Sequence, residues 1–171
     1  MLTLTARNLL KMTDRAAFER LALHVLRCAE SDCASVTRLG TNEEGETIVS
    51  PFDGFACVPG ATPSLHVAVE STTTDATGLE RKWLYDHTTY VPGKRPSKTP
   101  PTASDDGDLL KAAREAQTIR HGDPTIGCKV YLVTNQIVDP ALRAKVGQIA
   151  QSLNVECEVW EQVADRRLSG H

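Results

Sequence analysis

The chain has 171 residues, of which 40% are hydrophobic and 24% charged, and its net charge is −3. This length and composition predict a single domain, residues 1–171, with a full hydrophobic core. The charge gives no overall attraction to nucleic acid, so any such binding must rest on a local basic patch. No apolar run approaches the roughly 20 residues of a membrane span, and the first residues lack a signal-peptide pattern. We therefore expect a cytoplasmic protein with no membrane partner.

The first third of the chain predicts one helix followed by three strands. Residues 13–30 carry apolar side chains at steps of three and four, the spacing of a helix with one buried face, and Thr13 or Asp14 can cap it. Short turns separate three strand candidates, at 35–40, 47–58 and 65–71. Strands joined by short turns pair as an antiparallel meander. Pro51 indicates an edge position or a bulge in the second strand.

The rest of the chain alternates helices with strands. Residues 75–88 predict a helix that Gly78 weakens, and a long loop rich in proline runs from 89 to the next helix. The remaining candidates are a helix at 105–122, a strand at 128–135, a helix at 139–154 and a strand at 155–162. Asp139 and Pro140 are typical of a helix start. A strand–helix–strand order predicts a parallel crossover. The fold class is therefore α/β, with a mixed sheet (antiparallel meander plus parallel crossover strand) flanked by helices.

Two acidic residues stand at the ends of apolar runs in "PFDGFACVPGATPSLHVAVESTTT", residues 51–74. Asp53 comes early in one predicted strand and Glu70 ends the next, so adjacent strands can bring the two carboxylates together. Magnesium takes oxygen ligands, often one or two carboxylates completed by water and phosphate. Two ordinary explanations stand beside this one. Asp53 next to Gly54 also suits a turn or a bulge, and Glu70 also suits a plain strand end.

This order of elements, with its two acids, resembles the PD-(D/E)xK nuclease superfamily, and more closely its Mrr-like restriction endonuclease branch, over about residues 14–163. The stretches that carry the resemblance are "AFERLALHVL", "PFDGF", "HVAVEST" and "KVYLVTNQIVDPALRAKVGQIAQSLNVECEVWE". They are similar to the opening helix, the strand with the metal-binding aspartate, the strand that ends on the second acid, and the closing strand–helix–strand unit. The resemblance implies a restriction-endonuclease-like fold and a DNA endonuclease that depends on Mg²⁺ or Mn²⁺.

The resemblance also implies roles for individual residues. Asp53 and Glu70 bind the metal, the carbonyl of Ser71 completes its ligands, and Glu19 of the first helix assists. The family pattern places a lysine two residues after the glutamate, where this chain has Thr72. That lysine steadies the attacking water and the developing negative charge, whereas a threonine hydroxyl is neutral. Losing one such charge stabiliser commonly lowers the rate by about 10²–10³.

Lys82, on the helix that follows the third strand, is the first candidate to replace the missing lysine, and Arg81 and Lys129 are poorer ones. Alternatively, Thr72 itself stands in for the lysine as a catalytic residue. An exposed helix position is the ordinary explanation for Lys82, and a surface position is the ordinary explanation for Glu19. The concentrated basic tract of the long loop predicts phosphate contacts to DNA or, alternatively, a solvated loop. It comprises Lys94, Arg95 and Lys98.

Two functions follow from these observations. The first is an active endonuclease, the nuclease domain of a restriction or anti-phage defence protein, as the resemblance implies. The second is a catalytically decayed nuclease-fold module that binds DNA or a protein partner without cutting. The ending "VADRRLSGH" is compatible with a domain excised from a larger protein, and the resemblance implies fused domains or a homodimer as partners. A nucleotide-binding domain ranks below both, because no glycine-rich phosphate loop follows a predicted strand.

Overall fold

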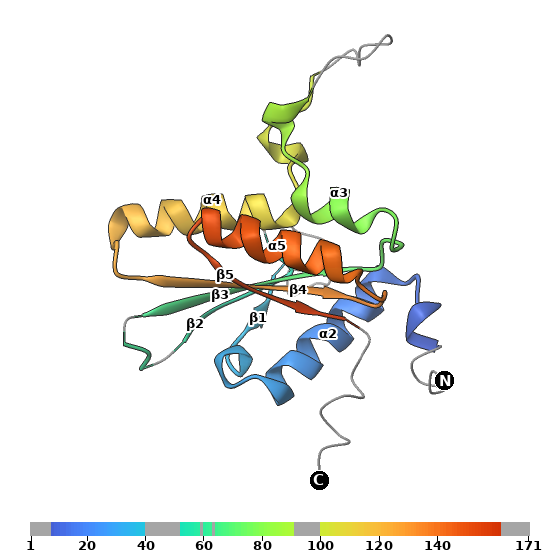
Figure 1. Ribbon diagram of the computed structural model, residues 1–171. Helices are drawn as coiled ribbons and strands as arrows, with labels where there is room; N and C mark the ends of the chain where they lie inside the picture. The colour runs from blue at the N-terminus through green and yellow to red at the C-terminus, as the bar shows by residue number, and fades with distance from the viewer. Residues whose placement is uncertain (1–7, 40–51, 59, 63, 91–99, 162–171) are drawn as a thin grey trace.

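The computed structural model describes residues 8–39, 52–58, 60–62, 64–90 and 100–161. This part of the chain is an α/β unit, a mixed sheet flanked by helices (Figure 1). The strands are β1 (Thr37–Arg38), β2 (Gly54–Val58), β3 (Leu65–Thr72), β4 (Gly127–Thr134) and β5 (Glu156–Trp160). The helices are α2 (Arg15–Ala29), α3 (Leu79–Leu84), α4 (Asp108–Gly122) and α5 (Pro140–Ser152). Three short 3₁₀ turns are η1 (Ser31–Cys33), η2 (His87–Thr89) and η3 (Ala103–Asp105).

The strands lie in the sheet in chain order, β1-β2-β3-β4-β5. The first three pair antiparallel, and the β3–β4 and β4–β5 pairs are parallel. The register places Gly54 opposite Val69 in the antiparallel pair and Glu70 beside Leu132 in the parallel pair. The predicted meander, the predicted parallel crossover and the mixed sheet are therefore confirmed.

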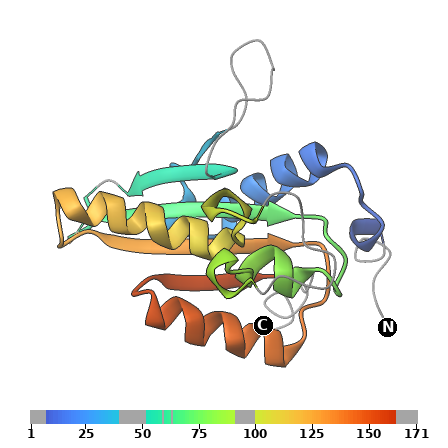
Figure 2. The same cartoon turned by 90° about the horizontal axis from the view of Figure 1, so that it is seen from above.

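Alternate residues of the central strands face two separate hydrophobic cores. Val67 and Val69 pack with side chains of α2, whereas Ala68 and Leu132 belong to the core formed with α3, α4 and α5. Seen from above, α3, α4 and α5 lie in front of the sheet and α2 lies on its other side (Figure 2). Both faces of β3 and β4 are buried, which explains why these strands are nearly continuous apolar runs. A polar side chain of β3 therefore points either toward α2 or toward α3, α4 and α5, according to its face of the sheet.

The helix ends follow the sequence signals where a capping side chain is present. Asp14 Oδ1 accepts a hydrogen bond from the Ala17 N–H at 3.0 Å, and Asp139 Oδ1 accepts one from the Ala141 N–H at 2.7 Å. Pro140 occupies the first turn of α5, as predicted. Among the described residues, no helix combines the length and the apolar character needed to cross a membrane.

Two helices begin later than the sequence pattern predicted. The expected start at 75 is a turn, because Asp75 Oδ1 accepts the Gly78 N–H at 2.8 Å. The expected start at 105 is the end of η3, where the side chains of Thr102 and Asp105 form a capping box. In both places a short polar side chain accepts a hydrogen bond from a backbone N–H in a local turn, so the regular helix begins later in the chain.

β2 begins at Gly54, so Asp53 stands directly before the strand, and the predicted strand positions 47–51 lie outside the described residues. A side chain at Gly54 would meet α2 and the segment after it. Its Cβ would lie 2.7 Å from Leu23 Cδ2 and 2.8 Å from Val36 Cγ1. The glycine therefore lets α2 approach the sheet beside Asp53.

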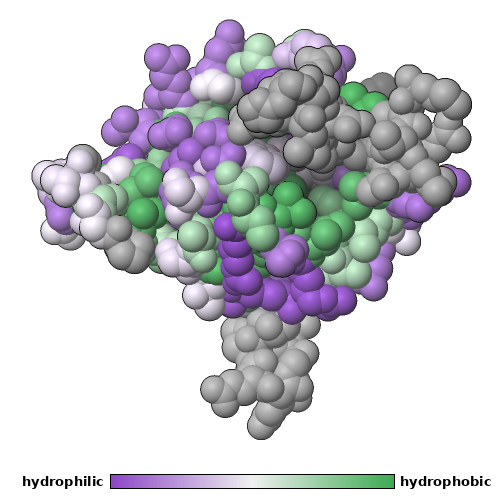
Figure 3. Space-filling model, turned by 90° about the horizontal axis from the view of Figure 1, so that it is seen from below, coloured by the Kyte–Doolittle hydropathy of each residue, from purple (hydrophilic) through white to green (hydrophobic). Residues whose placement is uncertain are grey.

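A polar network ties η1 to the sheet on the α2 side. The Lys129 ammonium lies 3.0 Å from Asp32 Oδ2 and 2.8 Å from Glu158 Oε1, and the Tyr131 hydroxyl donates to Asp32 Oδ1 at 2.8 Å. Burial raises the pKa of Asp32, but the hydrogen bonds from Tyr131 and Lys129 outweigh it and leave the pKa below its ordinary value. Figure 3 views the molecule from below, from the α2 side, where hydrophilic residues lie next to hydrophobic ones.

We expect Asp32→Asn to lower the free energy of unfolding at pH 7 by about 1–2 kcal/mol, because hydrogen bonds to a charged group contribute about this much. Since the pKa of Asp32 is lower in the folded state, its contribution is present above the unfolded-state pKa. The contribution is lost as the pH falls through the folded-state pKa. The difference from the wild type should therefore shrink below about pH 4, measured by urea unfolding. A difference that stays constant down to about pH 2.5 would contradict this role for Asp32.

Candidate active site

The backbone of Asp53 is hydrogen-bonded on one side to β3 and on the other to the residue that follows β1. Its N–H donates to the Val69 carbonyl at 3.1 Å, and its own carbonyl accepts the Leu39 N–H at 2.9 Å. Carboxylate oxygen Oδ2 accepts hydrogen bonds from the N–H of Ser71 at 2.7 Å and from the Ser71 hydroxyl at 2.8 Å. Oδ1 lies 3.5 Å from the guanidinium of Arg15, whose side chain is 64% exposed. One oxygen of Asp53 is thus occupied by buried donors, and the other faces a solvent-exposed cation.

Glu70 lies on β3 directly beyond the last residue that pairs with β2. The last pair of this ladder is Gly54 with Val69, and the Asp53 N–H also donates to the Val69 carbonyl, so Asp53 and Gly54 both lie against Val69. The Asp53 carboxylate itself contacts the hydroxyl of Ser71, which alternates with Glu70 along β3, and Arg15 at the start of α2. Glu70 alternates along β3 with Val69 and so points toward the face that α3 and α4 cover.

The carboxylate of Glu70 lies in an unfavourable environment for a charge. The residue is 6% exposed, and no described residue donates a hydrogen bond to this carboxylate. Burial raises the pKa of Glu70 well above its ordinary value, and repulsion from Asp108 and Asp53 raises it further. The positive charges of Lys82 and Lys111 offset part of this effect. Asp53 before β2 and charged residues of α3 and α4 therefore interact electrostatically with one buried carboxylate of β3.

Asp108 is a member of this group that the sequence pattern did not reveal. It opens α4, and its Oδ1 accepts a hydrogen bond from the Lys82 ammonium of α3 at 2.8 Å. Its other oxygen, Oδ2, is buried and has no hydrogen-bond partner in the described part of the chain. Burial raises the pKa of Asp108, and the attraction and hydrogen bond of Lys82 offset part of that rise. In the sequence, an acid in the first helical turn is explained by the helix dipole alone, so nothing distinguished Asp108 from Asp105 or Asp106.

The contact between α3 and α4 depends on Gly107. A Cβ at this position would lie 2.4 Å from the carbonyl carbon and oxygen of Trp83 and 2.6 Å from the Leu84 nitrogen. The Gly107 N–H donates to the Tyr85 carbonyl at 2.7 Å. Its backbone angles, φ −65° and ψ 158°, suit any residue, so space is what requires a glycine here. The close approach brings Asp108 within hydrogen-bonding distance of Lys82.

Two other predicted site residues are engaged elsewhere. The Thr72 hydroxyl donates to Thr74 Oγ1 at 2.8 Å and accepts the Thr74 N–H at 3.1 Å, so its hydrogen bonds stay within one turn. Glu19 is 9% exposed, and its Oε1 accepts a hydrogen bond from Arg38 Nε at 2.7 Å. Glu19 is therefore buried and ion-paired, which excludes the ordinary explanation of a surface position.

Of the remaining candidates, Lys129 lies on the opposite face of the sheet, and the basic tract falls outside the described residues. Lys129, the poorer replacement for the missing lysine, is bound to Asp32 and Glu158 on the α2 side. The basic tract Lys94, Arg95 and Lys98 lies outside the described residues. The structure thus brings together Asp53, Glu70, Ser71 and Lys82, adds Asp108, and engages the side chains of Glu19 and Thr72 in other contacts.

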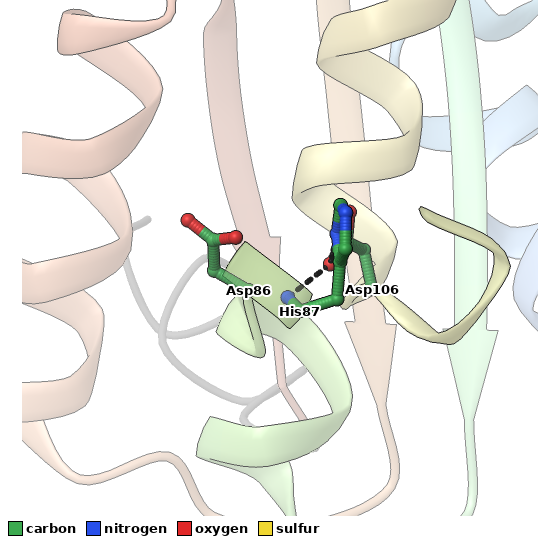
Figure 4. A group of neighbouring side chains, drawn as sticks. All are labelled: Asp86, His87 and Asp106. Atoms are coloured by element: carbon green, nitrogen blue, oxygen red, sulfur yellow. Dashed lines mark hydrogen bonds and ion pairs between the residues drawn. The ribbon is translucent and has the colours of Figure 1, made fainter. Parts of the chain in front are cut away.

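A second cluster of potential ligands lies at η2. Asp86, His87 and Asp106 form the only group of three or more such residues in the described ranges whose ligand atoms lie within 4.8 Å of one another. Figure 4 shows the Asp86 carboxylate apart from the contact between His87 and Asp106. Asp106 accepts the His87 N–H at 2.6 Å and forms an ion pair with Arg114, and Asp86 accepts the Thr88 N–H at 2.8 Å. These contacts account for the cluster as a cap and an ion pair that join η2 to α4.

Comparison with known proteins gives no match: no family model, no curated protein and no solved structure matches the chain. The assignment of the site therefore rests on its own geometry. The buried carboxylate of Glu70 lies within electrostatic reach of Asp53 and of the Lys82 ammonium, which Asp108 holds between α3 and α4.

We expect Gly107→Ala to lower the free energy of unfolding by about 1–3 kcal/mol, the usual cost of forcing an extra group into a packed interior. Gly147→Ala is the matched control, because a Cβ at Gly147 meets nothing within 4 Å. In the middle of α5, alanine should raise the free energy of unfolding by about 0.5–1 kcal/mol. Urea denaturation measures both variants. Equal effects of the two substitutions would show that α3 and α4 do not depend on Gly107 for their contact.

Proposed function

We propose that the chain is a metal-dependent DNA endonuclease that hydrolyses phosphodiester bonds, the nuclease domain of a restriction or anti-phage defence protein. The observation that carries this proposal is the Glu70 carboxylate, buried without a described hydrogen-bond donor and exposed to the charges of Asp53 and Lys82. A buried carboxylate with few hydrogen bonds destabilises a fold, and such groups concentrate at sites of chemistry. The resemblance to the PD-(D/E)xK superfamily provides the reaction class.

The oxygens of this site fit Mg²⁺ or Mn²⁺. Among the described residues, no buried donor contacts Asp53 Oδ1, and none donates to either oxygen of Glu70. Two carboxylates, completed by water and substrate phosphate, are a common set of ligands for Mg²⁺. When bound, such a cation polarises a phosphoryl oxygen and lowers the pKa of water. Ser71 orients Asp53 by donating from its N–H and hydroxyl, and its carbonyl is the predicted third ligand.

Lys82 takes the role of the lysine that the family pattern places on the strand. The corresponding residue, Thr72, has its hydroxyl bonded to Thr74, whereas the charge of Lys82 acts on Glu70. An ammonium held near the metal ligands stabilises the negative charge that develops on the phosphoryl group during attack by water. DNA is the proposed partner.

The absence of a lysine at Thr72 also supports a second function, a decayed nuclease-fold module that binds DNA or a protein without cutting. In that case the buried acids are remnants of a site, and Lys82 only neutralises Asp108. Cleavage and binding assays distinguish the two functions. A decayed module leaves plasmid DNA intact with Mg²⁺ or Mn²⁺, and any DNA binding weakens steeply with salt, as phosphate contacts do.

We expect the wild type to nick or linearise plasmid DNA with Mg²⁺ or Mn²⁺, and Asp53→Asn and Glu70→Gln each to lower the rate by about 10³ or more, since both remove a proposed metal ligand. The matched control is Glu80→Gln, because Glu80 is an exposed acid of α3 that pairs with Lys145. Agarose-gel kinetics with and without chelator measure the rates. Cleavage that survives both substitutions would assign the activity to another site or to a contaminant.

We expect Lys82→Met to lower the cleavage rate by about 10²–10³, the effect of removing one preorganised charge stabiliser. Thr72→Val should have a much smaller effect, because that hydroxyl is bonded within its own turn. Lys145→Met is the control for the loss of a surface ammonium. If Thr72→Val reduced the rate as strongly as Lys82→Met, the threonine hydroxyl would have to be placed at the reacting group instead.

A further inference from the structure

We propose that Asp108 is a positioning residue for this reaction: it holds the ammonium of Lys82 beside Glu70. The inference rests on the proposed function, because it explains how an ammonium on a helix can replace one on a strand. It assigns a role to a buried acid that no part of the family resemblance includes.

The hydrogen bond between the two residues is the first argument. Lys82 Nζ lies 2.8 Å from Asp108 Oδ1, and the exposed fractions of the two side chains are 31% and 4%. A lysine amine with this much solvent access ordinarily extends into water, because holding its four flexible bonds in one conformation costs entropy. A buried carboxylate that accepts a charged hydrogen bond offsets this cost. Asp108 therefore determines where the amine lies.

The rigidity of Asp108 is the second argument. Its neighbour Gly107 packs directly on the backbone of Trp83 and donates to the Tyr85 carbonyl at 2.7 Å. Trp83, which follows Lys82 in the chain, is fully buried. The start of α4 and the body of α3, seen side by side in Figure 2, are thus fixed to each other on both sides of the ion pair. The amine is held by a carboxylate that cannot move independently of its own helix.

The cost of a charge at this position is the third argument. Asp108 is 3% exposed, its Oδ2 has no hydrogen-bond partner among the described residues, and its charge repels that of Glu70. The helix dipole favours an acid at this position, but an exposed acid in the first turn would benefit in the same way without the repulsion. Serine or asparagine would suit the helix start without the buried charge. What only a carboxylate provides here is a strong hold on Lys82.

Competitive acetylation of the metal-free, full-length protein tests the hold directly. Acetic anhydride labels lysine amines according to their freedom and access, and Lys145, whose side chain is 52% exposed, is the internal reference. We expect Lys82 to react more slowly than Lys145 in the wild type. Asp108→Asn should raise the relative reactivity of Lys82 about tenfold, the factor that corresponds to losing a charged hydrogen bond. Asp108→Glu, which keeps the charge, should restore much of the protection. Asp108→Ser, which also suits a helix start, replaces Asp108→Asn if the latter does not fold.

Cleavage kinetics then separate positioning from a general structural role. Asp108→Asn should lower kcat about as much as Lys82→Met, with KM for DNA nearly unchanged, and the double variant should lose no more than either single variant. Wild-type Lys82 that reacts as fast as Lys145 would overturn the proposal without any variant. Full cleavage activity in a folded Asp108→Asn protein would overturn it as well. If the wild type cuts no DNA, the proposed function fails, and the acetylation result still decides whether Asp108 holds Lys82.

Discussion

The candidate site depends on the register between β2 and β3. A slip of one residue along β3 would turn Glu70 to the other face of the sheet, away from Lys82 and Asp108, and would break the hydrogen bonds between Asp53 and Ser71. Asp53 itself helps to prevent the slip. Its backbone bonds to Val69 and Leu39, and its carboxylate accepts both donors of Ser71, the residue that follows Glu70. Asp53, the proposed metal ligand, therefore also fixes the position of Glu70 on β3. One residue thus combines a structural role with a proposed chemical role.

The charged clusters on the two faces of the sheet differ in how well their hydrogen-bond donors and acceptors match. On the α2 side, the Lys129 ammonium is surrounded by acceptors, among them Asp32 and Glu158, and Tyr131 donates to Asp32. Donors and acceptors match there, as in a cluster that stabilises a fold. On the α3–α4 side, no described residue donates a hydrogen bond to Glu70, and Asp108 Oδ2 has no partner in the described part of the chain. This imbalance, rather than the presence of charge, is what distinguishes the second cluster as the candidate site.

Local signals predicted most of the sheet, because short turns force antiparallel neighbours and an intervening helix leads to a parallel strand. The same signals placed Asp53 and Glu70 on adjacent strands. They did not predict the partner of Lys82. Asp108 is 26 positions away along the chain, and the two meet only because Gly107 packs against α3. The ion pair of Glu19 with Arg38 also depends on tertiary packing, since β1 is too short for its side-chain directions to follow from a sequence pattern.

Moving the ammonium from a strand to a helix changes what determines its position. A lysine two residues beyond Glu70 would be placed on the same face by the pleat of β3 itself. Lys82 is placed instead by the packing of α3 on α4, through Gly107 and the buried ring of Trp83. The proposed metal ligands and the proposed charge stabiliser thus belong to separate structural units, the sheet and a helix pair. A change that loosens the helix pair would displace the ammonium and leave the bonds of Asp53 to Ser71 intact, so the proposed metal binding and the proposed cleavage rate would vary independently. In a site built on one strand, metal binding and rate would change together, because the same strand would position the metal ligands and the lysine. Catalysis requires sub-ångström placement, which loosely packed neighbours do not maintain.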